Sequence, residues 1–369
     1  MDPHGATARR FPLVARVRPP CLPLHRRVDK LTELADAAEA QAYQGQASSV
    51  FNQAALLASD LDLPELASQW CHQHAAAYLQ HTPLAGMDAI RALEPIVNLA
   101  RLHIRAGRTN QGHQLLLTLY DAVTAATTGT FEGIHVPADL TATDADRDEV
   151  RQWLWRVVIA DGTRALTTAG RWPDALAHLE KHRGVGAHML DGRQVAVLAR
   201  ATTGDHRGAQ QLLSDTIPGE PWENAVTACL TALCHPAAHR LAANELDVLT
   251  GYFPRLEIRA DLAVFHTRLL LSAIDIDRGA SHPGIRTEAS ALADRIADAR
   301  DGYAAREVLT HHGCTSILTE RQTRILEDTV EICALGHRAI PHNLRRRLSS
   351  ALLTSEAVIV RTLSAHFHR

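Results

Sequence analysis

Lysine and aromatic residues are scarce in this chain of 369 residues. Only two of its 38 basic residues are lysine, Lys30 and Lys181, and aromatic residues make up 4%. The resulting excess of arginine, together with abundant alanine, is typical of a protein from a high-GC bacterial genome. Hydrophobic residues still reach 46%, which excludes a disordered chain and provides a core of alanine, leucine and valine. The length favours two domains or one extended array.

An excess of either charge is also missing. The 38 Lys+Arg residues stand against 41 Asp+Glu, which gives a formal net charge of −3. A general binder of polyanions needs a strongly basic surface, so this balance excludes that class. A local basic patch remains compatible with it.

Long apolar runs and paired cysteine patterns are absent too. No stretch approaches the ~18–20 consecutive apolar residues that cross a bilayer, and prolines interrupt the basic first 27 residues where a secretory signal would need an apolar run. Six cysteines are scattered along the chain, unlike the dense pattern of a disulfide-stapled scaffold. We therefore expect a cytoplasmic protein with reduced thiols and no contact with membranes.

Apolar residues recur at helical spacing from about Val28 to the C-terminal end. Leu31, Leu34, Ala35 and Ala38 are one example of this spacing. Alternating strand patterns and Asn-Gly hairpin turns are missing. The sequence therefore predicts an all-α protein of antiparallel helices joined by short turns.

A 34-residue recurrence is the strongest internal pattern. Gly170 and Ala175 recur as Gly204 and Ala209, and Pro221 falls where such a unit should end. An earlier segment, Asn98-Leu99-Ala100 followed by Gly107, has the same turn glycine. This pattern resembles the tetratricopeptide repeat (TPR), a helix–turn–helix unit of 34 residues. The resemblance implies a TPR-like α-solenoid of helical hairpins with a concave surface that binds peptides, and an irregular helical bundle is the alternative.

Two interruptions suggest a division of the chain into three parts. We expect a flexible basic arm at residues 1–27, a helical-repeat domain at 28–276 and a helical C-terminal cap at 283–369. Residues 129–146 have no helical period and contain several glycines and aspartates. A loop of this length in a helical domain is usually functional or mobile, so we interpret it as an insertion, with a lid over the concave surface as one option.

Polar residues on the predicted inner helices are the candidate peptide-binding site. Asn and Gln amides can pair with a peptide backbone, and Arg can hold carboxylates in a fork. The alternative is a solvated face whose charges pair with one another. The candidates are Glu94, Asn98, Arg101, Arg105, Arg164, Asp191 and Gln194.

Histidines and cysteines do not form a convincing metal or catalytic motif. His178 and His182 lie at i, i+4, but Leu179 takes the place of the glutamate of a metalloprotease helix. Cys229, Cys234, His235 and His239 follow one another closely, with Pro236 between the two histidines, and the pairs His72/His74 and His311/His312 are equally dense. No nucleophile elbow, Walker loop or dinucleotide fingerprint is present. We expect no metal and no cofactor.

The C-terminal region offers a different function. Leu318-Thr319-Glu320-Arg321 and the later Ser355-Glu356 are faintly similar to LuxR-type helix-turn-helix domains, and Arg345, Arg346 and Arg347 would then meet phosphates.

Three function classes follow from the sequence. The favoured one is a helical-repeat protein that binds a peptide or protein segment as an accessory factor or regulator, for example in the biosynthesis of a ribosomally made modified peptide. The second is a lyase or cyclase that acts on a peptide in the same groove. The third, in which nucleic acid is the partner, is a DNA-binding regulator.

Overall fold

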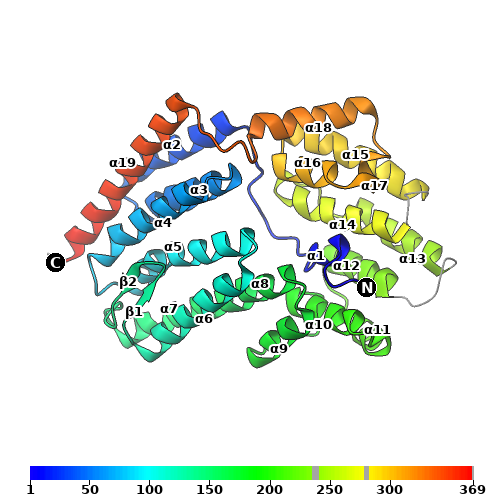
Figure 1. The fold of residues 1–369 in the computed structure, drawn as a ribbon, viewed down its shortest axis with the longest axis horizontal. Coiled ribbons are helices and arrows are strands. Elements are labelled where there is room, and N and C mark those ends of the chain that lie inside the picture. The colour runs from blue at the N-terminus through cyan, green and yellow to red at the C-terminus, as the bar shows by residue number, and fades with distance from the viewer. Residues whose placement is uncertain (235–240, 278–281, 368–369) are drawn as a thin grey trace. The chain divides into compact units, whose positions relative to one another are not determined.

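The computed structural model describes residues 1–234, 241–277 and 282–367, and helices dominate it (Figure 1). Among these residues the strands are the short antiparallel pair β1 (Gly129–Phe131) and β2 (Ile134–Val136). None of the helices in the described part combines the length and the apolar character needed to cross a bilayer. The all-α class predicted from the sequence is confirmed.

The chain forms two compact units, each made of segments distant in sequence. Unit 1 comprises Met1–Pro23 and Leu166–Cys333, and unit 2 comprises Leu24–Ala165 and Ala334–Arg369. This division differs from the three parts expected from the sequence. The first helix of unit 2 already begins at Leu24, inside the expected arm. The expected boundary at 277–283 includes residues 278–281, which lie outside the described residues.

Unit 2 contains helical hairpins covered by the C-terminal helix. Its helices are α2 (Leu24–Gln41), α3 (Gln44–Asp60), α4 (Pro64–Leu79), α5 (Gly86–Arg105), α6 (Thr109–Ala125), α7 (Asp144–Val157), η1 (Val158–Gly162), the start of α8 (Thr163–Thr168) and α19 (His342–Phe367). Helix α19 packs along α2, α3 and α4. The core is mainly aliphatic, as the scarcity of aromatics predicted, with Leu57, Leu93, Ile96 and Leu116 fully buried.

Unit 1 continues with shorter helices. They are α1 (Ala6–Arg9), α9 (Trp172–Lys181), α10 (Asp191–Thr202), α11 (His206–Ser214), α12 (Pro221–Cys234), α13 (Leu241–Thr250), η2 (Phe253–Arg255), η3 (Ala260–Leu262), α14 (Ala263–Asp277), α15 (Pro283–Ala299), α16 (Gly302–Leu309), α17 (His312–Thr315) and α18 (Glu320–Cys333). Consecutive helices from α9 to α14 pack against one another.

The recurring glycines occupy one type of helix corner. Gly107, Gly170 and Gly204 have φ angles of +78°, +71° and +85°, and each follows the end of a helix. In each case the backbone N–H of the next residue donates to the carbonyl five positions earlier, as Asp205 does to Arg200 at 2.9 Å. This left-handed helix end favours glycine, which has no Cβ to clash.

A small residue five positions after each corner glycine allows the two helices to cross closely. Gly112, Ala175 and Ala209 hold these places, and all three are buried. A Cβ on Gly112 would lie 2.6 Å from the carbonyl oxygen of Ala100. The corner and the close crossing therefore recur as the sequence pattern predicted, while the solenoid arrangement of the whole chain remains a prediction.

Residues 129–146 form part of unit 2. The hairpin β1–β2 buries Phe131, Ile134 and Val136 in the core. The turn between its strands is held by His72, whose Nε2 lies 2.8 Å from the carbonyl oxygen of Glu132. The segment ends in α7, which Thr143 caps by accepting from the Asp146 N–H. The hairpin thus packs as a fixed element, because its apolar residues replace the helical period with buried strand positions.

Candidate functional site

The predicted residues on α5 form a polar row that is paired within unit 2. The Asn52 side-chain amide donates to Glu94 at 2.6 Å, and the Asn98 amide donates to Asn52 at 2.8 Å. Arg101 donates to Asn98 and to Asp161, at 3.0 and 2.8 Å. Burial raises the pKa of Glu94. The structure therefore brings Glu94, Asn98 and Arg101 together, with α3 and η1 supplying their partners.

Arg105 lies at the end of this row in a second charge cluster. Its guanidinium contacts the Asp60 carboxylate at 3.3 Å and the Ser59 hydroxyl at 2.8 Å. Asp60 also pairs with Arg27 at 2.6 Å, and its side chain is only 4% exposed. The last predicted residue of unit 2, Arg164, is exposed on α8. The contacts described for α5 are those of the alternative interpretation, a helix face whose charges pair with one another.

The remaining predicted residues, Asp191 and Gln194, belong to unit 1 and contact a peptide segment of the same chain. Gln194 is fully buried. Its side-chain amide donates to the carbonyl oxygen of Leu13 at 2.6 Å, and its oxygen accepts the Leu13 N–H at 2.7 Å. Asp191 pairs with Arg16 at 2.6 Å. Residues 1–23, which we call the N-terminal arm, are thus held by α10.

Asp275 on α14 anchors the arm through charge. Arg10 donates to its carboxylate at 2.5 Å, Thr7 donates to the same oxygen, and His311 lies 2.9 Å from the other oxygen. Burial by itself raises the pKa of Asp275, but the hydrogen bonds from His311, Thr7 and Arg10 outweigh it and hold the pKa well below its usual range. The Arg10 side chain is 9% exposed, so this is a largely desolvated ion pair.

Further contacts hold the two ends of the arm. The guanidinium of Arg18 lies 4.2 Å from the ring centroid of Tyr303, a cation–π contact. The Cys21 N–H donates to Asp301 at 3.0 Å, and the Cys21 carbonyl accepts from Gly302 N–H at 2.9 Å. Near the other end, the Trp172 indole N–H donates to the Pro3 carbonyl at 3.1 Å. We define the arm-binding surface as Asp191, Gln194, Asp275, Asp301 and Tyr303.

The sequence contained part of the signal for this site. Arg10, Leu13 and Arg16 are evenly spaced as Arg-x-x-Leu-x-x-Arg, among prolines that keep a chain extended. Asp191 and Gln194 were predicted from the repeat register. Asp275, Asp301 and Tyr303 were not predicted, because they lie far along the chain, in helices whose register carried no repeat signal.

The cysteines of the described residues are buried thiols rather than activated nucleophiles. Burial raises the pKa of Cys71 and of Cys314 to about 12 and that of Cys234 to about 11. A nucleophilic or metal-binding cysteine needs the thiolate, which a depressed pKa would favour. These thiols therefore pack as small hydrophobic groups.

No group of three or more metal-binding side chains is found in the part of the chain that the structure describes. In the His72/His74 pair, both nitrogens of His72 lie within hydrogen-bond distance of carbonyl oxygens, and His74 is buried in the core of unit 2. His178 and His182 place their rings 4.8 Å apart without an acidic third member nearby. His235 and His239 lie outside the described residues.

The C-terminal residues do not form the predicted helix-turn-helix. Thr319 and Glu320 open α18 in unit 1, whereas Ser355 and Glu356 lie in the middle of the continuous helix α19 in unit 2. A helix-turn-helix needs a turn just before its recognition helix. The similarity of these two segments to LuxR-type domains therefore does not extend to their structure.

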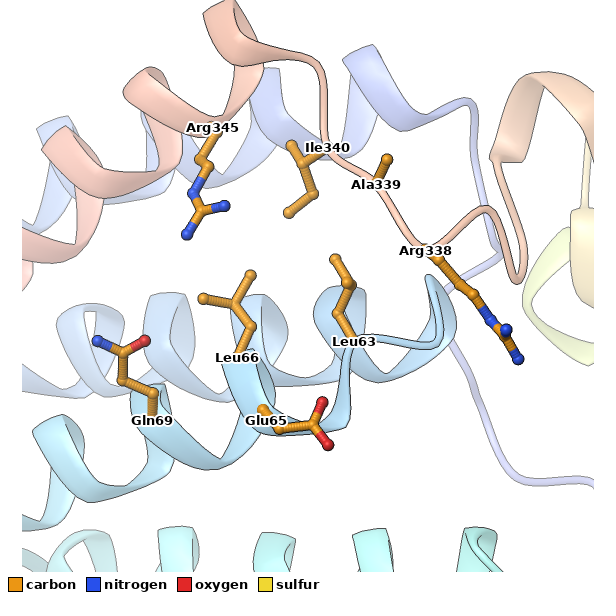
Figure 2. Close-up of a pocket in the computed structure, with 8 residues that line it drawn as sticks. All are labelled: Leu63, Glu65, Leu66, Gln69, Arg338, Ala339, Ile340 and Arg345. Atoms are coloured by element: carbon orange, nitrogen blue, oxygen red, sulfur yellow. The ribbon is translucent and has the colours of Figure 1, made fainter.

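The three consecutive arginines of α19 face different surroundings. Arg347 pairs with Asp29 at 2.8 Å, Arg346 is exposed, and Arg345 lines a cavity of about 320 Å³. Figure 2 shows the Arg345 side chain pointing across this cavity toward α4, with Leu63, Leu66 and Ile340 around it and Arg338 at one end. The run thus forms no single basic face for a nucleic-acid backbone.

Comparison with protein-family models, with curated proteins and with solved structures found no match for this chain. The functional argument therefore rests on the arm-binding surface itself.

Proposed function

We propose that this protein binds an extended peptide or protein segment without changing it covalently, and that unit 1 supplies the binding surface. One observation carries the proposal: the buried amide of Gln194 hydrogen-bonds both backbone groups of Leu13. A side-chain amide that pairs with an N–H and a C=O of one residue reads the peptide backbone, whatever the side chain is. Such a contact suits recognition of extended segments.

The surrounding charges give this surface a preference among peptides. Asp275 and Asp191 face arginines on either side of Leu13. Charge-assisted hydrogen bonds to arginine are stronger than neutral ones and add geometric specificity. We therefore propose a ligand that is extended and carries arginine.

The wider role follows the sequence-based expectation. The 34-residue recurrence with its glycine corners supports a TPR-like helical-repeat protein, and we propose that it acts in the cytoplasm as an accessory factor or regulator. Binding of a ribosomally made precursor peptide is the specific version of this role. The raised pKa values of Cys71, Cys234 and Cys314 support binding over catalysis by these thiols.

Selection from a displayed library of random 12-residue peptides tests the proposal. The full-length protein is used as bait, both as wild type and as Arg16→Glu, which loosens the arm. We expect peptides with arginine to be enriched, and titration should show binding that Gln194→Ala weakens at least tenfold. Gln211→Ala is the matched control, since Gln211 is an exposed glutamine of the same unit.

Two results would count against the proposal. If the folded proteins enrich no peptide, binding of an extended segment is wrong. If an enriched peptide changes mass during incubation with the protein, the lyase or cyclase alternative replaces simple binding.

A further inference from the structure

We infer that the N-terminal arm is an intramolecular competitor of the ligand: a partner segment with the pattern Arg-x-x-Leu-x-x-Arg binds in extended form only after it displaces the arm. This inference rests on the proposed function and adds to it the ligand pattern and its regulation.

The pattern is read from the contacts of the arm itself. Arg10, Leu13 and Arg16 are three residues apart, and their partners are Asp275, Gln194 and Asp191. From Leu13 to Arg16 the arm runs forward, while its partners on α10 run backward from Gln194 to Asp191. The arm therefore lies antiparallel to this helix, and the two arginines fix its register around the backbone contact at Leu13.

Much of the binding can be reproduced by a foreign peptide. The contacts at Pro3, Leu13 and Cys21 use the backbone of the arm, and so does the hydrogen bond of 2.9 Å from Arg18 N–H to the Asp261 carbonyl. Backbone contacts are available to any extended segment of suitable length. Sequence preference then comes from the arginines and from the apolar residues Phe11 and Leu13, which are 3% and 2% exposed.

The charges of the arm and of its surface are complementary. The arm carries the arginines Arg9, Arg10, Arg16 and Arg18 against the single acidic residue Asp2. Its surface offers three carboxylates, those of Asp191, Asp275 and Asp301. A partner segment with a similar excess of arginine would be attracted to the same surface, and salt would weaken this attraction.

The arm can leave unit 1 without breaking its core helices. It is a free chain end that precedes α2, and its residues from Val14 to Pro20 are half-buried or exposed. Exchange can therefore begin in this stretch, while Arg10 and Leu13 remain bound. Figure 1 shows the other end of the arm, where α1 lies beside α14. A tethered arm competes at a high effective concentration, so it lowers the apparent affinity of a partner.

Fluorescence anisotropy with a labelled synthetic peptide of residues 6–22 as the probe tests the inference on the full-length protein. We expect Arg16→Glu to bind the probe at least tenfold more tightly than wild type, because the glutamate repels Asp191 and weakens the competing arm. The Arg16 side chain is 57% exposed, so this change spares the core. A probe with alanine at the positions of Arg10 and Arg16 is the control and should bind at least tenfold more weakly.

A charge swap separates competition from general loosening. In the double variant Arg16→Glu/Asp191→Arg the arm can pair again, so affinity for the wild-type probe should fall back to the wild-type level or below. In the single variant Asp191→Arg, a probe that carries glutamate in place of Arg16 should bind more tightly than the wild-type probe. Circular dichroism confirms that each variant is folded.

The inference and the proposed function fail in different ways. If wild type and Arg16→Glu bind the probe equally, or if the charge swap has no effect, the arm is a structural strap and the inference is wrong. Peptides enriched from the library would still support the proposed function. If neither the probe nor any library peptide binds a folded variant, both are wrong.

Discussion

Gly170 and Gly204, 34 residues apart in the sequence, hold the same left-handed corner at the end of successive helical hairpins, with φ angles of +71° and +85°. In both corners the following residue donates to the carbonyl five positions earlier. The surroundings of the two glycines differ, since a Cβ on Gly170 would meet His4 of the arm, whereas a Cβ on Gly204 would meet nothing within 4 Å. Gly204 therefore isolates the conformational cost of the corner.

Gly204→Ala should lower the free energy of unfolding by about 1 kcal/mol. A residue with a Cβ pays roughly 1–2 kcal/mol in the left-handed region, and the lower entropy of its unfolded chain offsets part of this cost. Thermal unfolding measures the effect. The reciprocal control is Ala126→Gly at a corner where alanine has a φ of +49°. It should stabilise the protein by a similar amount, and a destabilised Ala126→Gly would contradict the explanation.

Gln194→Ala should destabilise unit 1 by roughly 2–4 kcal/mol. Leu13 is buried, and each buried backbone group left without a partner costs about 1–3 kcal/mol. Chemical denaturation gives the free energy, and limited proteolysis should cut the arm earlier than in wild type. Gln211→Ala should change the stability by less than about 0.5 kcal/mol, as is usual for an exposed position. Equal effects of the two changes would show that the Leu13 contact contributes nothing.

Asp275→Asn should cost about 3–5 kcal/mol, because it leaves the buried charge of Arg10 without its partner. The folded-state pKa of Asp275 is held below its usual range, so its stabilising contribution is present at neutral pH. This contribution is lost only as the pH falls below the unfolded-state value of about 3.9. Urea unfolding at pH 7 and at pH 5 should therefore give the same difference between variant and wild type.

Replacing both members of the pair provides the control. Arg10→Met/Asp275→Leu should be less destabilised than Asp275→Asn, because an apolar pair of similar size leaves no uncompensated charge. A double variant as unstable as the single one would show that the ion pair itself, and not the unpaired charge, sets the cost.

His74 should make unit 2 less stable in mild acid. Burial lowers its pKa to about 3, and its ring stacks on Phe51 with 5.0 Å between centroids. Below about pH 6.5 the unfolded state binds a proton that the folded state does not, so stability falls as the pH falls, by up to about 1.4 kcal/mol per pH unit. His74→Leu should remove this part of the slope between pH 6.5 and 4.

The control for this titration is an exposed histidine. His206→Leu should leave the pH dependence of unfolding as in wild type. His266 in unit 1 has a pKa lowered to about 4, first by burial and then by Arg295, and it should keep a residual slope in His74→Leu. A His74→Leu protein with the full wild-type slope would contradict a buried, neutral His74.

Arg101→Glu separates the two sets of predicted site residues. Arg101 is half-exposed and pairs with Asp161, so the change places like charges together and should destabilise unit 2 by about 1 kcal/mol. If unit 1 binds the peptide, the affinity of Arg101→Glu for a library peptide should stay within twofold of wild type. A loss comparable to that of Gln194→Ala would place the site on the α5 row instead, as the repeat register first suggested.

The contacts of the candidate site were only partly foreseeable. Asp191 and Gln194 followed from the 34-residue register, because that register sets which residues of a helix share a face. The partner of these residues was not readable, since nothing in a proline-rich arm states which distant helix it will contact. The α5 row was predicted as one face correctly, yet its pairing with Asn52 and Asp161 depends on how α3 and η1 pack beside it.

The sequence by itself determined the helices and their corners, since helical periodicity and the need for glycine at a positive φ act over a few neighbouring residues. Only the tertiary structure decided that Arg10 meets Asp275 and that Leu13 meets Gln194. Those contacts join positions more than 180 residues apart, and they form because burying Phe11 and Leu13 requires partners for the charges and backbone groups beside them.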